Sequence, residues 1–366
     1  MPTGRRGPGG RIAGAALSLL ALLLSCTGAG AASAAEAPPP APRTVGTASY
    51  NLYLGANLQP LFAATSQAEL VQRAGETYRA MESTNFPERA TAIADLLAAR
   101  APDVVGLQEV ARWERGPLTG EPAVTQDFLA ILLAELAERG TPYRAVAVNT
   151  NFTGQLPISA TEQARFTDRD VIIVREGLPV SRLRTSDAQE HTFAAKLVIP
   201  SRIPGLSFTV PRGWSAVDVT VRGKTFRFAN THLEAFGPAA VRNAQAQEMA
   251  AALAASPYPV VLAGDLNSRP TDGAGAYGIV AAAGFADSWL ASGGEVDGGW
   301  TSGQTDSLLD PGRITHRIDY VLAQPRGIGF VSAEVIGEEE ADRSSPTGFW
   351  PSDHAGVVAV LRLARP

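Results

Sequence analysis

The 366-residue sequence contains a single cysteine, Cys26, so the chain can form no internal disulfide bond. Small secreted proteins that rely on disulfide bonds for their stability are therefore excluded as a class. A chain of this length that is 45% hydrophobic and 18% charged has enough apolar material to bury a large core instead. We expect its stability to come from packing of that core or from bound metal.

Positive charge is also scarce. Lys and Arg together number 31 against 36 Asp and Glu, and only Lys196 and Lys224 are lysines. Residues 1–35 carry three arginines and no acid, so the rest of the chain has 31 − 3 = 28 basic and 36 acidic side chains, a formal charge of −8. This balance argues against a broadly basic surface for nucleic acid, although it leaves room for a local basic patch.

The longest apolar run near the N-terminus has basic residues before it and small residues after it. Three arginines precede it and small residues follow it, in the order Arg5, Arg6, Arg11, Ile12–Leu24 and Thr27–Ala35. The run is too short to span a bilayer comfortably. The pattern therefore predicts a secretory signal peptide over residues 1–35, with cleavage close to Ala34.

Two other export routes stay open from the sequence. The stretch Leu23-Leu24-Ser25-Cys26 resembles a bacterial lipobox, which would place a lipid anchor at the cell surface through Cys26. The Arg5-Arg6 pair is also compatible with a twin-arginine signal. On each route the mature protein acts outside the cytoplasm, and secretion is the expected outcome.

The rest of the chain contains no second linker, no internal repeat and no transmembrane pattern. Residues 36–43, rich in proline, predict an extended tether, and residues 44–366 predict one domain. Helices are expected at 87–100, 125–139 and 238–254, short buried strands at 171–174, 196–199 and 259–264, and a hairpin from 216–221 and 225–230. Further strands are expected at 318–322, 329–336 and 356–363. This alternation predicts an α/β fold of mixed sheets packed together, with helices outside.

Polar residues suited to catalysis follow or interrupt otherwise apolar strands, where a rigid sheet can hold reactive groups at a common edge. They are Asn51, Glu109, His232, Asp265, Asn267, Asp319, Asp353 and His354. Each alone has an ordinary structural explanation, such as a solvated carboxylate or an Asx turn. Their combination favours a catalytic site, because two of only four histidines in the chain occupy such positions.

The order of six short motifs resembles the endonuclease/exonuclease/phosphatase superfamily, which includes deoxyribonucleases, abasic-site endonucleases, inositol polyphosphate phosphatases and neutral sphingomyelinases. The motifs are Ser49-Tyr50-Asn51, Leu107-Gln108-Glu109, Asn230-Thr231-His232-Leu233, Gly264-Asp265-Leu266-Asn267, Arg317-Ile318-Asp319-Tyr320 and Ser352-Asp353-His354. They span nearly the whole mature chain. The resemblance implies a four-layer α-β-β-α sandwich of two mixed sheets, with helices on both outer faces and a metal site at one edge.

The resemblance also implies a metal and a base. It implies that Glu109 binds Mg²⁺, that Asn51 assists in binding it, and that Asp353 lies close to the metal. Mn²⁺ and Ca²⁺ are also hard cations that such oxygen ligands can bind. The resemblance assigns His354 as general base or acid, with its ring oriented by Asp319, and we expect the strands of these two residues to be neighbours. Together they suit in-line attack of water on phosphorus with no covalent enzyme intermediate.

The remaining positions receive supporting roles from the resemblance. His232 would bind the phosphate or assist the leaving group, and Asp265 and Asn267 would orient water and phosphate. In extended backbone the last two side chains face the same way, because they are two residues apart. Asp168 would be the acidic partner of His232, although Asp170 is equally near in the sequence.

The first motif favours a lipid phosphodiester as substrate. Residues 51–60, read as NLYLGANLQP, are similar to the opening motif of secreted bacterial sphingomyelinases, whereas abasic-site endonucleases usually carry an acid where Tyr53 stands. Residues 231–235 are also similar to the sphingomyelinase form. Phe349 and Trp350 precede His354 and, if exposed, suit a membrane interface or base stacking; the alternative is that Trp350 packs beneath the loop.

A secreted nuclease is the main alternative, since arginine suits bidentate contacts with phosphate. The arginines that flank the proposed site are Arg112, Arg115, Arg165 and Arg169. A phosphomonoesterase acting on inositol or sugar phosphates and a catalytically inactive binding module are further alternatives. The binding module is disfavoured because such a protein would be expected to have lost a metal or base residue, and none is missing.

Two long segments, 55–86 and 111–167, exceed what a minimal core requires, and we expect them to cover the edge of the site and control access. The expected partners are a phosphodiester substrate, either a phospholipid headgroup or nucleic acid, and a membrane contacted peripherally. No obligate protein partner is evident from the sequence, and we expect a monomer.

Overall fold

The computed structural model describes residues 43–364. The predicted signal peptide, residues 1–35, and residues 36–42 of the predicted tether lie outside the described residues. The first strand begins at Thr44, directly after the predicted tether. Among the described residues, no helix combines the length and the apolar character needed to cross a membrane.

The described chain alternates helices and strands. The helices are α1 (Gln59–Phe62), α2 (Gln67–Ser83), α3 (Phe86–Arg100), α4 (Phe128–Glu138), α5 (Ala239–Ala254), α6 (Ala276–Ala282) and α7 (Ser288–Ala291), with a 3₁₀ turn, η1 (Glu340–Asp342). The strands are β1 (Thr44–Asn51), β2 (Val104–Gln108), β3 (Arg112–Pro117), β4 (Ala123–Asp127), β5 (Tyr143–Pro157), β6 (Glu162–Arg175), β7 (Leu183–Thr192), β8 (Leu197–Pro200), β9 (Ser207–Val210), β10 (Gly213–Val221), β11 (Lys224–His232), β12 (Val260–Asp265), β13 (Ala286–Asp287), β14 (Asp319–Ala323), β15 (Ile328–Ile336) and β16 (Gly356–Leu363).

These strands form two large mixed sheets and one small hairpin. The eight-stranded sheet has the order β15-β16-β1-β2-β6-β3-β4, with β5 also paired to β6, and the six-stranded sheet has the order β13-β14-β12-β11-β10-β7. Strands β8 and β9 pair only with each other. The pairs β1–β2 and β11–β12 are parallel, whereas β16 runs antiparallel to β1 and β14 runs antiparallel to β12.

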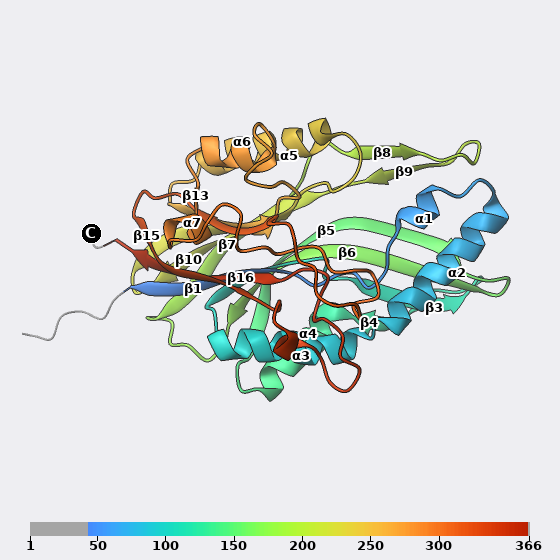
Figure 1. Ribbon diagram of the computed structural model, residues 1–366, viewed down its shortest axis with the longest axis horizontal. Helices are drawn as coiled ribbons and strands as arrows, with labels where there is room; N and C mark the ends of the chain where they lie inside the picture. Colours follow the sequence, from blue (N-terminus) through green and yellow to red (C-terminus); the bar gives the residue numbers. More distant parts are fainter. Residues whose placement is uncertain (1–42, 365–366) are drawn as a thin grey trace, which may run out of the picture. The chain divides into compact units, whose positions relative to one another are not determined.

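Helices cover the outer face of each sheet, which makes a four-layer α-β-β-α sandwich. Figure 1 shows α5 and α6 on the side of the six-stranded sheet and α3 and α4 on the side of the eight-stranded sheet. In β12, Val261 and Ala263 pack between the sheets, while Val260 and Leu262 pack toward α5 and α6. Burial on both faces explains why such central strands are continuous apolar runs in the sequence.

One edge of the sandwich collects the residues that the sequence pattern singles out. Because β1 and β2 are parallel, and β11 and β12 are parallel, each pair ends on one side of its sheet. The residues at or just after these four strand ends are Asn51, Glu109, His232 and Asp265. Antiparallel β14 begins there too, with Asp319 opposite Asp265 in register, and the residues before β16 reach the same edge.

The structure confirms helices at 87–100 and 238–254, as α3 and α5, and the hairpin of β10 and β11. The helix expected at 125–139 has a later start. Residues 123–127 form β4, and the Asp127 side chain caps α4 by accepting hydrogen bonds from the Leu129 and Ala130 amides. A carboxylate at this position satisfies amides that have no partner inside the helix, which fixes the helix start.

Two expected strands also differ from the structure. Residues 171–174 are only the end of β6, whose earlier part extends beyond β2 to pair with β3 and β5. The strand expected at 196–199 is β8, and it is largely exposed rather than buried, with only Leu197 buried. Its sole pairing partner is β9, so nothing in the large sheets covers it.

Candidate active site

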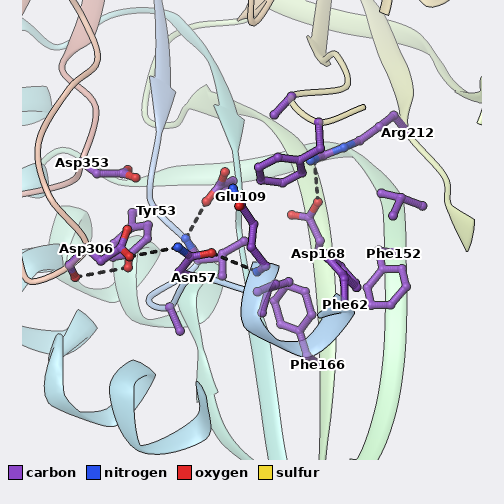
Figure 2. Close-up of a pocket in the computed structure, with 17 residues that line it drawn as sticks. Tyr53, Asn57, Phe62, Glu109, Phe152, Phe166, Asp168, Arg212, Asp306 and Asp353 are labelled. Atoms are coloured by element: carbon purple, nitrogen blue, oxygen red, sulfur yellow. Dashed lines mark hydrogen bonds and ion pairs between the residues drawn. The ribbon is translucent and has the colours of Figure 1, made fainter. Parts of the chain in front are cut away.

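A pocket of about 190 Å³ opens at the edge where the strand ends meet, and we call it the rim pocket. Its lining includes the acids Glu109, Asp168, Asp306 and Asp353, the cation Arg212, and the aromatic residues Phe62, Phe152, Phe166 and Phe236. Figure 2 shows Glu109 and Asp353 at one end and the phenylalanines Phe62, Phe152 and Phe166 at the other. The rim pocket therefore combines a charged end with an apolar wall.

Glu109 is held at the charged end by its backbone. It follows β2 in a left-handed conformation, with φ 53°, and its Oε2 accepts a hydrogen bond from the Leu54 amide at 2.7 Å. Burial raises the pKa of its carboxyl to about 7, and repulsion from Asp353 and Asp168 adds to the effect. Carboxylates that raise one another's pKa in a buried space are a favourable setting for a cation.

The same residues fit a divalent cation. Hard cations take carboxylate and amide oxygens as ligands, and Glu109 and Asp353 supply carboxylates at the charged end of the rim pocket. Asn51 contributes less freely, because its Nδ2 donates to Asp265 Oδ2 at 3.2 Å and its Oδ1 accepts from the Tyr53 amide at 3.0 Å. Only the second lone pair of that Oδ1 is left for a metal.

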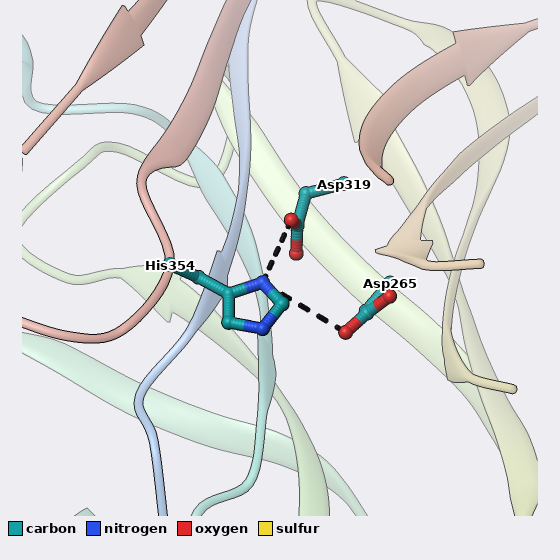
Figure 3. A group of neighbouring side chains, drawn as sticks. All are labelled: Asp265, Asp319 and His354. Atoms are coloured by element: carbon teal, nitrogen blue, oxygen red, sulfur yellow. Dashed lines mark hydrogen bonds and ion pairs between the residues drawn. The ribbon is translucent and has the colours of Figure 1, made fainter. Parts of the chain in front are cut away.

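His354 and Asp319 form a close polar pair at the site. His354 Nδ1 lies 2.8 Å from Asp319 Oδ2 and 3.9 Å from Asp265 Oδ2. Figure 3 shows the His354 ring facing these two carboxylates. Burial alone would lower the pKa of the His354 ring, but the carboxylates of Asp319 and Asp353 outweigh it and raise the pKa well above its usual value. With Asp319 as acceptor, Nδ1 carries the proton of the neutral ring.

The strands of this pair are not neighbours in one sheet, contrary to expectation. Asp319 opens β14 of the six-stranded sheet, whereas His354 precedes β16 of the eight-stranded sheet. The two side chains therefore meet across the interface between the sheets. Together with Asp265 they offer ligand atoms within 4.8 Å of one another, which is also a cation-type arrangement. Because the hydrogen bond already joins Nδ1 to Asp319, the geometry of this trio also suits a group that holds a proton.

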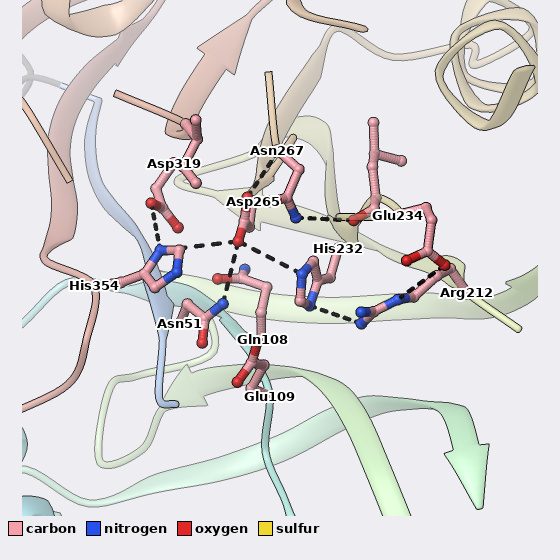
Figure 4. Close-up of polar contacts among 12 residues, drawn as sticks. Asn51, Gln108, Glu109, Arg212, His232, Glu234, Asp265, Asn267, Asp319 and His354 are labelled. Carbon is pink, nitrogen blue, oxygen red and sulfur yellow. Dashed lines mark hydrogen bonds and ion pairs between the residues drawn. The ribbon is translucent and has the colours of Figure 1, made fainter. Parts of the chain in front are cut away.

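His232 is the centre of a second group of contacts. Arg212 Nη1 lies 3.0 Å from His232 Nδ1 (Figure 4) and 3.1 Å from Asp168 Oδ2 (Figure 2). A guanidinium can only donate, so Nδ1 accepts and the proton of the neutral His232 ring lies on Nε2. Burial, with Arg212 and His354 nearby, lowers the pKa of His232 well below its usual value. This ring is therefore neutral and presents an N–H toward Asp265, 3.5 Å away.

Asp168 thus contacts His232 through Arg212 rather than directly. Asp170 lies further back, where its Oδ2 accepts from Asn151 Nδ2 at 2.9 Å. Burial raises the pKa of Asp170 well above its usual value, with Asp168 adding repulsion. The sequence alone could not choose between the two acids, and the geometry puts only Asp168 on the rim pocket.

The expectation that Asp265 and Asn267 share one face of an extended strand is wrong, because Asn267 lies beyond the end of the strand. Strand β12 ends at Asp265, and Asn267 has a left-handed backbone with φ 47°. The Asn267 amide donates to Asp265 Oδ1 at 2.8 Å, which is an Asx turn, and its Nδ2 donates to the Leu233 carbonyl at 3.0 Å. Burial raises the pKa of Asp265 to about 7, with Asp319 adding repulsion.

Sequence reasoning missed three residues that support the site. Thr301 Oγ1 donates to Asp319 Oδ2 at 2.6 Å and accepts from the Asp319 amide at 3.1 Å, but it lies in an irregular loop with no pattern to reveal it. Arg212 lies between Val210 and the buried strand β10, and a lone arginine there was an available signal. The third, Arg89, interrupts the apolar face of α3.

Arg89 is fully buried and joins two loops of the site. Its guanidinium donates to the carbonyls of Leu52 and Pro351 at 2.8 Å each, and also to those of Tyr53 and Thr84. Leu52 directly follows Asn51, and Pro351 precedes Ser352, Asp353 and His354. One side chain therefore fixes the backbone on which two sets of candidate residues depend.

Replacing Arg89 by methionine is expected to destabilise the fold, because four buried carbonyls lose their donor. Each unpaired buried carbonyl costs roughly 1–3 kcal/mol, so we expect the free energy of unfolding to fall by about 3 kcal/mol or more. Chemical denaturation would measure the loss, with Arg100→Met as control, since Arg100 is exposed at the end of the same helix. Equal stability of the two variants would contradict this role.

The structure argues against two possibilities left open by the sequence: an exposed aromatic pair at Phe349 and Trp350, and free arginines beside the site. Phe349 and Trp350 are only 5% and 1% exposed, so they form neither a membrane contact nor a stacking platform. The four flanking arginines are each engaged by acids: Arg112 with Glu114, Arg115 with Glu162, Arg165 with Glu114, and Arg169 with Asp127. These ion pairs leave fewer cations available for a polyanion.

Comparison with known proteins adds a family and a fold. The sequence profile described as "Endonuclease/Exonuclease/phosphatase family" matches residues 48–354. A comparison with curated protein sequences gives no match. Among solved structures, a protein of the same family description from Bacteroides thetaiotaomicron is 19% identical with a TM-score of 0.54, over 88% of this chain and 99% of that one.

Two further solved structures are similar to this chain. TDP2 of D. rerio, complexed with single strand DNA product, is 18% identical with a TM-score of 0.51, over 87% of this chain and 98% of that one. A mannosyl-6-phosphatase from Bacteroides thetaiotaomicron VPI-5482 is 21% identical with a TM-score of 0.50, over 87% and 99% of the two chains. At these identities the similarity establishes a shared fold and leaves the substrate open.

Proposed function

The chain belongs to the endonuclease/exonuclease/phosphatase family, whose members are phosphoester hydrolases, and on that premise we propose that it is a secreted, Mg²⁺-dependent phosphodiesterase of sphingomyelinase or phospholipase C type. It would attack the phosphorus of a phospholipid with water. The observation that carries the choice of a lipid is the make-up of the rim pocket, whose charged end continues into a wall of phenylalanine side chains.

A nucleic-acid substrate has less support. Affinity for a polyanion comes mainly from lysine and arginine contacts with successive phosphates. Arg165 and Arg169 beside the site are engaged by Glu114 and Asp127, and the chain beyond residue 35 is acidic overall. The motif around Tyr53, similar to that of secreted sphingomyelinases, also favours a lipid.

In this proposal the chain's carboxylates hold the cation and its histidines handle protons. A divalent cation held by Glu109 and Asp353, with Asn51 beside them, would neutralise charge on the phosphate as water attacks. In the neutral ring, His354 donates a hydrogen bond from Nδ1–H to Asp319, which leaves Nε2 to accept a proton from that water. Asp319 then stabilises the charged ring, and Thr301 holds Asp319 in place.

His232 would serve the phosphate rather than the water. Since Arg212 occupies its Nδ1, the Nε2–H, which faces Asp265 at 3.5 Å, is the group that would donate to a phosphate oxygen or to the leaving oxygen. Arg212 itself lines the rim pocket and adds a positive charge there. The acid behind it, Asp168, holds the guanidinium in position rather than acting on the substrate.

Replacing Arg212 by lysine tests this arrangement, because lysine keeps the charge but lacks the planar group that reaches both Asp168 and His232. We expect kcat/KM to fall by roughly 10–100-fold, the effect typical of residues that orient a functional side chain. Arg227→Lys is the matched control, since Arg227 makes similar ion pairs with Asp218 and Asp187 away from the site. Equal activity of both variants would remove Arg212 from the mechanism.

The proposed substrate class is tested by side-by-side assays of the purified protein. The substrates are sphingomyelin and phosphatidylcholine vesicles, duplex and single-stranded DNA, and inositol phosphates, each with and without Mg²⁺. We expect Mg²⁺-dependent release of phosphocholine from the lipids and little cleavage of DNA. Faster turnover of DNA would instead establish the nuclease, and turnover of inositol phosphates alone would establish a phosphomonoesterase.

Export is proposed from the pattern of residues 1–35 alone. Mass spectrometry of the protein recovered from the producing cells is expected to give an N-terminus at Ala35 or Glu36. A diacylglycerol group on Cys26 would show that the lipid-anchoring route operates instead. An unprocessed chain retained in the cytoplasm would contradict export altogether.

A further inference from the structure

A second cavity, of about 310 Å³, lies directly beside the rim pocket, and we call it the apolar cavity. Its walls come from the α1 region, α2, β3, the β5–β6 pair and the β9 region, and all lining residues except those near β9 belong to segments 55–86 and 111–167. The residues that matter for the argument are Phe62, Ala74, Trp113, Phe152, Phe166 and Phe208. A volume of this size falls within the range of small-molecule sites.

The apolar cavity and the rim pocket adjoin each other. Four residues line both spaces, namely Leu58, Phe62, Phe152 and Phe166. Figure 2 shows three of them next to Asp168, on the side of the rim pocket away from Asp353. A molecule whose phosphate contacts the charged end can therefore extend along these side chains into the apolar cavity.

The lining of the apolar cavity carries no charged side chain. Two of its polar groups are already satisfied within the protein: Trp113 Nε1 donates to the Leu54 carbonyl at 3.0 Å, and Gln155 Nε2 donates to Gln163 Oε1 at 2.7 Å. The other polar side chains of the lining are the hydroxyls of Thr77, Thr153, Ser207 and Thr209, so a nucleobase placed here would meet few partners besides hydroxyls for the groups it buries, which is costly. A hydrocarbon chain has no such groups to satisfy.

Several apolar side chains around this cavity are only half-buried. Leu58, Phe62, Phe152 and Phe208 come from three different parts of the fold and all keep some exposure. The edge-to-face contact of Phe62 with Phe208, with centroids 5.1 Å apart, brings α1 against β9 at one wall. Covering such surface with an apolar ligand is favourable, because it removes apolar area from water on both molecules.

We propose that the apolar cavity binds a hydrocarbon chain of the substrate while its phosphate occupies the rim pocket. This inference rests on the proposed function and narrows it to phosphoesters that carry an alkyl or acyl chain. The enzyme would thus recognise both the hydrocarbon chain and the phosphate of its substrate. Segments 55–86 and 111–167 would act as the chain-binding wall, which gives their length a function.

The test uses n-alkyl phosphonates, from methyl to octyl, as inhibitors of bis(4-nitrophenyl) phosphate hydrolysis, all below their critical micelle concentrations. The inhibition constant is expected to fall by about threefold to fourfold for each added methylene until the cavity is filled, the gain typical of burying one methylene. An inhibition constant that does not change with chain length, in an enzyme that turns over, would overturn the inference and leave the phosphodiesterase standing. Tighter inhibition by thymidine 5′-monophosphate than by octyl phosphonate would also overturn it, in favour of a nucleobase site.

A variant pair locates the effect. Ala74→Phe fills the apolar cavity from α2. This variant is expected to lose most of the decrease in inhibition constant between butyl and octyl phosphonate. Its inhibition constant for methyl phosphonate should stay within about twofold of the wild-type value. Ala68→Phe is the matched control, because Ala68 is exposed on the same helix. An unchanged dependence on chain length in Ala74→Phe would place the chain elsewhere.

A binding measurement on the wild-type protein separates this inference from the proposed function, because it does not depend on turnover. An 8-bromooctyl phosphonate is expected to quench the fluorescence of Trp113, which lines the cavity, and methyl phosphonate is expected to leave it unchanged. Trp113→Phe should remove that component of the quenching. Absence of quenching in the wild-type protein would overturn the cavity as a chain site, even if phosphodiester hydrolysis is found.

Discussion

Replacing His354 by alanine is expected to lower kcat for bis(4-nitrophenyl) phosphate by roughly 10²–10⁴-fold, the contribution typical of a general base. The ring is buried, its Nδ1 contacts Asp319 at 2.8 Å, and its position beside Asp353 puts it next to the proposed cation ligands. No other histidine contacts Asp319 among the described residues, so nothing replaces the lost base. His191→Ala is the control, because His191 is exposed on β7.

Replacing Asp319 by asparagine is expected to be nearly as damaging. An asparagine amide can donate to His354 Nδ1 and so favour the tautomer in which Nε2 carries the proton and cannot accept another, a loss comparable to that seen when the acid of a catalytic triad is neutralised. The double variant should be little worse than either single one, since the members of one catalytic unit are strongly non-additive. Losses that multiply in the double variant would mean that the two residues act independently.

Replacing Glu109 by glutamine is expected to reduce turnover by orders of magnitude while the fold persists. Glutamine has nearly the same shape and can still accept the hydrogen bond from the Leu54 amide, but it brings no negative charge to a cation. High Mg²⁺ should restore only part of the activity, because a neutral ligand weakens binding without removing the site. Glu176→Gln, exposed just after β6, is the control.

The measurements for Glu109→Gln are the Mg²⁺ dependence of kcat and circular dichroism of the folded state. Wild-type protein freed of metal by exhaustive chelation should behave like Glu109→Gln and recover fully when Mg²⁺ is added. Full activity in the variant, or in the chelated wild type, would contradict the assignment of Glu109 as the principal metal ligand.

The sequence predicts the fold class and the set of residues that meet at the edge, because both follow from patterns along single strands. Continuous apolar runs such as 260–263 mark strands buried on both faces, and a polar residue at the end of such a run, as at Asp265, marks the edge. The order of six such motifs also identifies the family, which the profile match over residues 48–354 confirms.

The sequence could not predict the contacts that tune those residues, because these depend on which side chains approach from elsewhere in the fold. Thr301 reaches Asp319 from an irregular loop, and Arg89 reaches the Leu52 and Pro351 carbonyls from a helix far away in the sequence. Arg212 intervenes between Asp168 and His232, which no spacing rule anticipates. Three-dimensional packing alone brings these groups together.

The sequence also does not predict the backbone conformation at the strand ends. Extended geometry predicts that Asp265 and Asn267 share a face, but the chain leaves the strand at Asp265 and closes an Asx turn instead. Likewise, Phe349 and Trp350 look in sequence like an exposed aromatic pair, and tertiary packing buries both. Such local exceptions occur where the chain turns at the functional edge, and there periodic rules no longer apply.

The central claim is that water activated at His354 attacks the phosphorus of a bound ester, and isotopic labelling tests it most directly. Bis(4-nitrophenyl) phosphate is hydrolysed in oxygen-18 water by the wild-type protein and by His354→Ala, with and without chelator. The account predicts a single oxygen-18 atom in the 4-nitrophenyl phosphate formed by the wild type with Mg²⁺, unlabelled 4-nitrophenol, and almost no product in the other samples. Label in the 4-nitrophenol, or equal product formation by His354→Ala, would contradict it.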